Sequence, residues 1–390
     1  MNHSNFNFYD AFDFDDDTLV LAFQVATAVV AEEESNNQGR RTRYRGSIPG
    51  HNIVNRNRKE VEAHNSYFKQ RTDALGVLGL SCLQKITAAH RILAYGIPAD
   101  LTDEYLRIGE TTAIESLRAF VKAIVEVFGD WYLRAPNEAD ICRLLSIGEQ
   151  RGFPGMLGSI DCMHWKWEKC PIAWHGMYTG HCREPTIILE AVASQDLWIW
   201  HAFFGMPGSL NDINVLDRSP IFAALAEGRT APVNYTINGH EYTMGYYLAD
   251  GIYPNWSTFV KTIPRPLGAK RKYFASKQES ARKDVERAFG VLQSRFAIVR
   301  GPVRYWDEET LAYIMKACII MHNMIIEDEG AMNLRFDHEH EVISFISVSH
   351  CEIPELHDFL QTHNRIRDRA TSSQLQEDLI EHLWEQYGNE

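Results

Sequence analysis

Three acidic residues, remote from one another along the chain, have neighbours that suit a metal site. Asp161 and Asp250 each end an apolar run, and Glu286 lies in a segment with helical spacing. Apolar runs of this length predict buried β-strands, each carrying one carboxylate at its end. Any one of these acids alone is equally consistent with a turn or a helix cap. Together they supply the oxygen ligands that a pair of hard cations such as Mg²⁺ requires.

A fourth acid, Asp212, follows the segment 207–211 and precedes an expected helix. Its carboxylate could cap that helix, because aspartate is favoured at helix N-termini. We rank Asp212 below the other three acids as a metal ligand and expect it to position substrate. The alternative is that Asp212, and not Asp250, is the second primary ligand.

Basic residues accompany the acids and predict contacts with a phosphate backbone. Arg282 precedes Glu286 by four residues, so the two share one face of a helix. These cations could instead pair with the acids around them, and we favour phosphate contact. The residues expected to contact DNA are Lys166, Lys270, Arg271, Lys272, Arg282, Lys283 and Arg287, joined by Arg40, Arg41, Arg43 and Arg45 of an N-terminal arm.

A zinc site is the weaker interpretation of the chemistry around Asp161. The residues that suggest it are Cys162, His164, Cys170, His181 and Cys182. None of the cysteine pairs has the Cys-x2-Cys spacing of a zinc knuckle, so we favour carboxylate ligands. His322 lies in an apolar helical segment and is predicted to be a hydrogen-bonded core residue.

The charge of the chain is unevenly distributed. The net charge of −13 argues against a nucleic-acid binder at first sight. However, residues 261–287 hold nine Lys or Arg against three Asp or Glu, whereas residues 327–390 hold four against fifteen. A basic middle between acidic ends is compatible with DNA binding. The seven cysteines lack the spacing of a disulfide framework and indicate a reducing compartment, and no apolar stretch is long enough to span a membrane.

Composition divides the 390 residues into four expected parts. Residues 1–59 form an acidic and then basic arm, largely disordered, with one short helix at 18–34. The basic half is equally consistent with a DNA contact and with a linker or nuclear-import signal. Residues 60–147 form a helical domain, 152–326 an α/β domain, and 327–390 an acidic tail. A terminal helix in this tail has an apolar stripe, expected to dock on the chain's own core, made of Leu375, Leu379, Ile380, Leu383 and Trp384.

The helical part contains a pattern typical of a helix-turn-helix. A helix over 82–95, a break at 96–98 and a short helix over 103–108 come in succession. The next helix is expected to begin with a capping box at Thr112 and Glu115. The alternative is a helical bundle that packs on the following domain without contacting DNA.

The α/β part has the element order of a ribonuclease-H-like nuclease core, a mixed sheet flanked by helices. Strands are predicted at 156–161, 186–193, 198–204 and 246–250, and helices at 215–225, 277–296 and 309–326. In such a core the first acid lies on the first strand, the second follows the fourth strand, and the third lies on a late helix. Asp161, Asp250 and Glu286 occupy these places.

Five segments around these acids resemble the PIF/Harbinger transposase family, whose nucleases carry an aspartate–aspartate–glutamate (DDE) triad. The matching segments are 155–165, 185–193, 205–217, 245–254 and 282–290, and the resemblance covers roughly 68–326. The chain departs from the expected pattern in two ways. Its helical segment before 75 is short, which would weaken DNA recognition. Gln293 stands where a lysine often follows the catalytic glutamate in related bacterial transposases.

The resemblance implies a DNA endonuclease and transposase that uses two Mg²⁺ or Mn²⁺ ions. Asp161 would bridge both ions, with Asp250 and Glu286 each completing one shell, for phosphodiester hydrolysis and strand transfer. It further implies a nuclear protein that acts on transposon ends and a target site, with a Myb-like DNA-binding partner and no membrane. Assembly into a homo-oligomer is a further expectation.

Two other hypotheses compete with the nuclease. A domesticated, transposase-derived adaptor would bind DNA or chromatin without cutting it, but relatives of that kind usually lose a triad acid, and all three are present here. A metal-dependent phosphoesterase for small substrates is disfavoured by the basic segments and the long flanking helices.

Overall fold

The computed structural model describes residues 59–102, 106–223, 233–334 and 356–389. The predicted N-terminal arm, its helix at 18–34 and its four arginines lie outside these residues. They therefore stay predictions, as do the domain boundaries that were drawn from composition.

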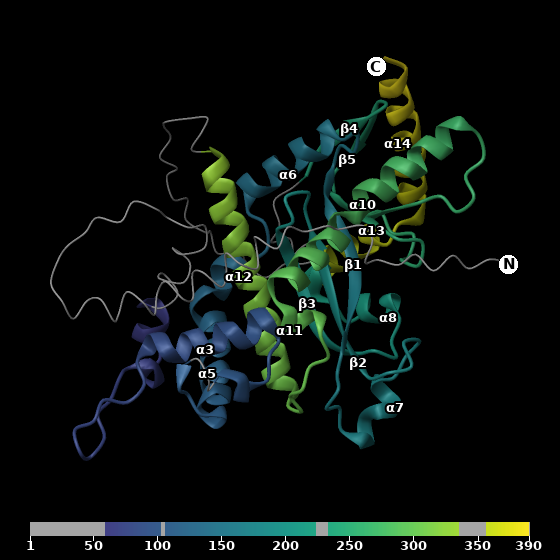
Figure 1. Cartoon of the computed structure of the whole chain (residues 1–390). Coiled ribbons are helices and arrows are strands. Elements are labelled where there is room, and N and C mark those ends of the chain that lie inside the picture. Colours follow the sequence, from purple (N-terminus) through teal and green to yellow (C-terminus); the bar gives the residue numbers. More distant parts are fainter. Residues whose placement is uncertain (1–58, 103–105, 224–232, 335–355, 390) are drawn as a thin grey trace.

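A mixed five-stranded sheet forms the centre of the protein (Figure 1). The strands lie in the order β3-β2-β1-β6-β7. β1, β2 and β3 are antiparallel neighbours, whereas β6 runs parallel to β1 and β7 parallel to β6. Their bounds are Met156–Lys166 (β1), Thr186–Ala193 (β2), Ile199–Pro207 (β3), Tyr246–Ala249 (β6) and Phe259–Lys261 (β7). The protein is thus mixed α/β, and this order is consistent with the predicted ribonuclease-H-like core.

All four predicted strands are present, and three short strands were missed. β7 has three residues, as do β4 (Tyr235–Ile237) and β5 (His240–Tyr242), which form a separate hairpin. Strands this short do not leave a measurable alternation of apolar and polar residues. Only pairing with a neighbour distinguishes them from loops.

Helices flank the sheet on both faces. One face carries Met163 and Leu189 and shares a hydrophobic cluster with the helices before and after the sheet. The other face carries Ile160 and Val192 and packs near the short helix at 212–216. The helices are α3 (Cys82–Tyr95), α5 (Glu110–Tyr132), α6 (Glu138–Gln150), α7 (His175–Tyr178), α8 (Asp212–Leu216), α10 (Ala269–Arg295), α11 (Ala297–Arg300), α12 (Glu308–Leu334), α13 (Leu356–Ile366) and α14 (Arg369–Asn389). Short 3-10 helices are η2 (Ser66–Phe68), η3 (Ala99–Thr102), η4 (Ile172–Trp174) and η5 (Pro220–Phe222).

Two predicted helices differ from those observed. α10 begins eight residues before the predicted 277, and the basic segment around Lys270 is therefore helical. The predicted helix over 215–225 is replaced by α8 and η5, with residues 224–232 outside the described ranges. Ser219 interrupts the predicted helix, because its side chain accepts a hydrogen bond from the backbone N–H of Ile221 and so begins the separate helix η5.

The N-terminal helices only partly follow the helix-turn-helix prediction. α3 has the predicted bounds and ends in the left-handed Gly96. After the break the chain forms η3, residues 103–105 lie outside the described ranges, and 107–109 are not helical. The predicted capping box at Thr112 is wrong, because α5 already begins at Glu110. Capping boxes occur instead at Ser81 in α3 and Asn137 in α6.

α12 connects the N-terminal helices with the sheet. It packs beside α5 and reaches the start of β3 (Figure 1). His322 is fully buried and its Nε2 lies 2.9 Å from the Leu197 carbonyl, which confirms the predicted core histidine. The next residue, Asn323, bonds to both backbone groups of Ile199. By length and composition α12 is the one described helix that could cross a membrane, but it is 67% buried inside the protein, as a core helix would be.

The terminal helix α14 packs on the chain's own core, as predicted. Leu375, Leu379, Ile380 and Leu383 are buried in a cluster with Phe274 of α10. Figure 1 shows α14 beside α10 at the opposite end of the protein from α3 and α5. The acidic tail thus contributes a structural helix to the fold.

Candidate active site

Strand pairing brings the first two acids to one level of the sheet. In the parallel pair of β1 and β6, Ser159 is the register partner of Leu248. Asp161 and Asp250 each follow two residues later, and because side chains alternate along a strand they continue the same face. Leu248 packs in the cluster that contains Phe274 of α10, so this face is the one that α10 covers. The register therefore places both carboxylates under α10.

α10 is attached to the sheet immediately beside these acids. The Val285 backbone N–H donates to Ser159 Oγ at 3.0 Å. The buried Gln278 donates its amide to the carbonyls of Ala249 and Val260, both at 3.1 Å, and so joins β6 to β7. Arg282, four residues before Glu286, contacts both the Glu286 and the Asp161 carboxylates, so Glu286 lies on the side of α10 that approaches β1.

Backbone groups hold the two aspartates in place. Asp161 Oδ1 accepts from the Cys162 backbone N–H at 2.8 Å. Asp250 Oδ1 accepts from the Ile252 N–H at 2.9 Å, which closes the turn after β6. Lys261 supports this turn by donating from Nζ to the Tyr253 carbonyl at 2.8 Å. Both carboxylates therefore keep one oxygen for another partner.

The three acids influence one another electrostatically. Burial, together with the nearby charges of Glu286 and Asp250, raises the pKa of Asp161 to about 6. The Cys162 N–H and the Arg282 guanidinium act in the opposite direction. Asp250 and Glu286 thus lie near enough to Asp161 to affect its pKa, and the predicted three-acid metal site itself stays a prediction.

Arg282 lies inside this cluster. Its Nη1 is 2.7 Å from Glu286 Oε1 and 3.4 Å from Asp161 Oδ2. In the part of the chain that the structure describes, no group of three His, Cys, Asp or Glu side chains is already close enough to hold a metal ion. The donor set still fits Mg²⁺, because three carboxylates with one guanidinium leave an excess of two negative charges and offer hard oxygen ligands.

Asp212 lies beside the cluster, next to Asp250. It is the first residue of α8, and the predicted capping role belongs to Asn211, whose side chain accepts from the Asn214 N–H. Burial raises the pKa of Asp212, the Cys162 side chain hydrogen-bonds to it and lowers the pKa, and Asp250 and Glu190 raise it again. Asp250 therefore lies near both Asp161 and Asp212.

A buried carboxylate on β2 was not assigned a role from the sequence. Glu190 is fully buried and Oε1 accepts from Ser219 and lies 3.1 Å from His201 Nε2, while Oε2 has no hydrogen-bond partner. It is the register partner of Cys162 and raises the pKa of Asp212, so it lies near that aspartate. The signal in the sequence is a single acid inside the apolar run 186–193, because a charge in a covered strand requires a specific partner.

Among the described basic residues that were expected to contact DNA, most already have acidic partners. Arg271 bonds to Glu377 at 2.7 Å, and Lys270 bonds to Glu381. Lys166 pairs with Glu184 at 2.7 Å, and Arg287 pairs with the buried Asp284. Lys272 and Lys283 are exposed, and neither forms an ion pair with the described residues. Gln293, in place of the expected lysine, donates to the Met163 sulfur at 3.0 Å.

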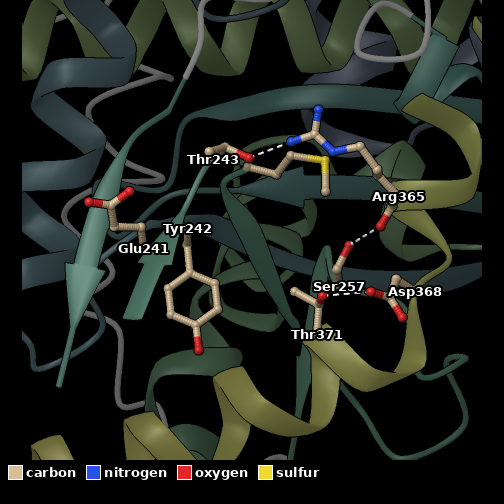
Figure 2. Close-up of a pocket in the computed structure, with 8 residues that line it drawn as sticks. Glu241, Tyr242, Thr243, Ser257, Arg365, Asp368 and Thr371 are labelled. Atoms are coloured by element: carbon tan, nitrogen blue, oxygen red, sulfur yellow. Dashed lines mark hydrogen bonds between the residues drawn. The ribbon is translucent and has the colours of Figure 1, made fainter. Parts of the chain in front are cut away.

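A separate cavity of about 170 Å³ lies between β5 and the start of α14. Figure 2 shows Arg365 bonded to Thr243, and Ser257 bonded to the Arg365 backbone. None of the acids of the cluster lines this cavity. It therefore does not belong to the candidate active site.

Comparisons with known proteins concern the family and not the individual site residues. The model of a family described as plant transposon protein matches residues 130–333, a range that includes all four acids. The Arabidopsis thaliana protein "Protein ALP1-like" is 23% identical over 259 residues, which are 64% of this chain and 62% of that protein. The chain thus spans less than two thirds of the length of this curated relative. No solved structure matches the chain.

Proposed function

Because the chain belongs to the plant transposon protein family and is related to PIF/Harbinger-type transposases, we propose that it is a divalent-metal-dependent DNA endonuclease and transposase. The observation that carries this proposal is the convergence of Asp161, Asp250 and Glu286 on the α10 side of the sheet. The strand order further supports assigning the core to the ribonuclease-H-like nucleases. In such a core these acids form the catalytic cluster.

In the proposed site the three carboxylates hold two Mg²⁺ or Mn²⁺ ions. Bound there, the ions would activate a water or 3′-hydroxyl and stabilise the leaving oxygen of the phosphodiester. The protein's part is to fix the carboxylates, which the contact of Ser159 with α10 and the contacts of Gln278 with β6 and β7 accomplish. Lys261 supports the turn after Asp250, and Asp212 lies near Asp250.

DNA is the proposed substrate because the helix that carries Glu286 also carries exposed cations. Arg282 contacts two of the acids, and Lys272 and Lys283 are exposed on the same helix. Contacts of these side chains with phosphates would make binding fall steeply with salt. We further propose a nuclear location, a Myb-like partner that supplies sequence recognition, and a homo-oligomer that holds both element ends.

The test is cleavage of DNA bearing the element's own ends, in Mg²⁺ or Mn²⁺, by the wild-type chain and by Asp161→Ala, Asp250→Ala and Glu286→Ala. Each variant is expected to lose cleavage by at least about a thousandfold while still binding DNA, because each acid acts on the metal and not on DNA affinity. Arg300→Gln, at the end of α11, removes a charge outside the cluster and serves as the control.

The adaptor is the competing function. A wild-type chain that binds DNA but never nicks it, with or without a Myb-like partner, would favour a domesticated DNA- or chromatin-binding protein. The salt bridges of Arg282 are compatible with that role, since they give the acids a cation that belongs to the chain itself.

A further inference from the structure

One nitrogen of Arg282 contacts two of the three acids. Nη1 lies 2.7 Å from Glu286 Oε1 and 3.4 Å from Asp161 Oδ2. The arginine side chain is 17% exposed, against 20% for Asp161 and 36% for Glu286. A guanidinium this well enclosed interacts more strongly with its partners than a surface ion pair does. It therefore occupies the position of a cation between the first and third acids.

The backbone that carries Arg282 is held on both sides. Gln278, one turn earlier, bonds to the carbonyls of β6 and β7, and Val285, one turn later, bonds to Ser159. A change in the position of the guanidinium therefore has to come from rotation of the long arginine side chain. Glu286 is the more exposed of its two partners, so the guanidinium can leave on that side.

The carboxylate oxygens of Asp161 and Glu286 cannot bind the Arg282 guanidinium and a metal ion fully at the same time. A carboxylate oxygen that accepts a hydrogen bond from the guanidinium has to release it, or share its lone pairs, to coordinate a metal ion at close range. Resting on the metal site of the proposed function, we propose that Arg282 is an exchangeable counter-ion: its guanidinium and a divalent cation compete for Asp161 and Glu286. The displaced guanidinium stays beside the site, where the DNA phosphate is expected to bind.

This competition has a consequence for coupling between ligands. Metal binding that displaces Arg282 makes the guanidinium available for a phosphate, and a phosphate that binds Arg282 makes the carboxylates available for metal. By linkage, each ligand then raises the affinity for the other by the same factor. DNA and metal would therefore bind cooperatively, and the cooperativity would depend on this one side chain.

The experiment measures the affinity of the full chain for Mn²⁺ by titration calorimetry in the absence of DNA. Arg282→Gln is expected to bind Mn²⁺ roughly tenfold more tightly than wild type, because the metal no longer displaces charged hydrogen bonds. Arg282→Lys keeps the charge without the planar fork, and its affinity should lie between the two. Lys277→Gln, which removes an exposed charge from the same helix, should stay close to wild type.

Thermal unfolding gives a second readout. In EDTA, Arg282→Gln should unfold at a lower temperature than wild type, because Asp161 and Glu286 then lack a cation. Saturating Mn²⁺ should raise its unfolding temperature more than that of wild type, whereas a purely structural role would lower stability equally in both conditions. Adding a duplex should tighten Mn²⁺ binding by wild type and have little effect on Arg282→Gln.

The outcomes separate the two proposals. Wild type that binds Mn²⁺ as tightly as Arg282→Gln, or more tightly, overturns the counter-ion and leaves the nuclease intact. Failure of wild type and of both Arg282 variants to bind Mn²⁺ overturns the metal site and the counter-ion together. Tight binding by Arg282→Gln, with weak binding by wild type, supports both.

Discussion

Ser159 of β1 accepts a hydrogen bond from the backbone N–H of Val285 in α10, at 3.0 Å between Oγ and N. Ser159 is two residues before Asp161, and Val285 is one residue before Glu286. Both Ser159 and Val285 are buried. This contact therefore helps to fix the distance between the first acid and the third.

Replacing the hydroxyl should loosen that spacing. Ser159→Ala removes the acceptor from a buried N–H, so we expect the free energy of unfolding to fall by about 1–2 kcal/mol in urea titrations. Mn²⁺ affinity should fall severalfold as well, since Asp161 and Glu286 are no longer held at one distance. Ser276→Ala, at an exposed position of α10, is the matched control. Unchanged stability and unchanged affinity together would show that the contact does not hold the site.

The order of importance of Asp250 and Asp212 can be measured directly. The charge of Asp250 raises the pKa of Asp161. The pKa of Asp212 is raised by both Asp250 and Glu190, and Asp212 also forms a hydrogen bond with Cys162. Asp250→Ala should therefore weaken Mn²⁺ binding by about a hundredfold or more, and Asp212→Ala by about tenfold or less. The reverse order in calorimetry would make Asp212 the second triad acid.

Stability in EDTA should depend on the ionisation of Asp161. Its folded-state pKa, raised by burial to about 6, is above the unfolded value, so the native state binds this proton more tightly. The stabilising contribution is complete below about pH 4 and is lost as the pH rises through 6; the loss is on the order of 2–3 kcal/mol. Asp161→Asn should lack this loss.

The measurement is the unfolding temperature between pH 5 and 8, followed by circular dichroism. Wild type should lose stability relative to Asp161→Asn over this range, and saturating Mn²⁺ should reduce the difference. Parallel curves for the two proteins would contradict the raised pKa. Asp217→Asn replaces an exposed aspartate that follows α8 and controls for a general effect of charge.

The acidic helix α14 should weaken DNA binding through its pairs with α10. Lys270 bonds to Glu381 and Arg271 bonds to Glu377, so these cations are engaged within the chain. Glu377→Gln combined with Glu381→Gln should raise duplex affinity several- to tenfold at low salt in fluorescence anisotropy, and steepen the salt dependence by up to about two ions. Glu385→Gln removes an exposed acid from the same helix and should have little effect. An equal rise in duplex affinity for the double variant and for Glu385→Gln would indicate a general effect of net charge.

The sequence alone was sufficient to predict the elements that carry the site. Covered strands leave long apolar runs, and so β2 was predicted with its observed bounds, whereas β1 continues five residues beyond the predicted end at Asp161, which therefore lies inside the strand. α3 was predicted with its exact bounds because its apolar spacing ends at a glycine. The same local patterns located Asp250 at the end of a strand and Glu286 on a helix.

The partners of charged side chains could not be predicted from local patterns. Arg282 has a spacing that permits phosphate contact, and the structure shows it between two of the acids. Lys270 and Arg271 belong to a basic stretch in the sequence, yet their partners are more than 100 residues away on α14. Which opposite charge lies within reach depends on how helices pack, and no periodicity records this.

Hydrophobic periodicity is a property of neighbouring residues, so the amino-acid sequence predicted the acids and the strands and helix that carry them. The positions of these acids relative to one another depend on how the core packs. The register of β1 against β6, the contact of Ser159 with α10 and the contacts of Gln278 with β6 and β7 bring the three carboxylates together. These contacts join segments that are remote in the chain, and they form only when the whole core packs.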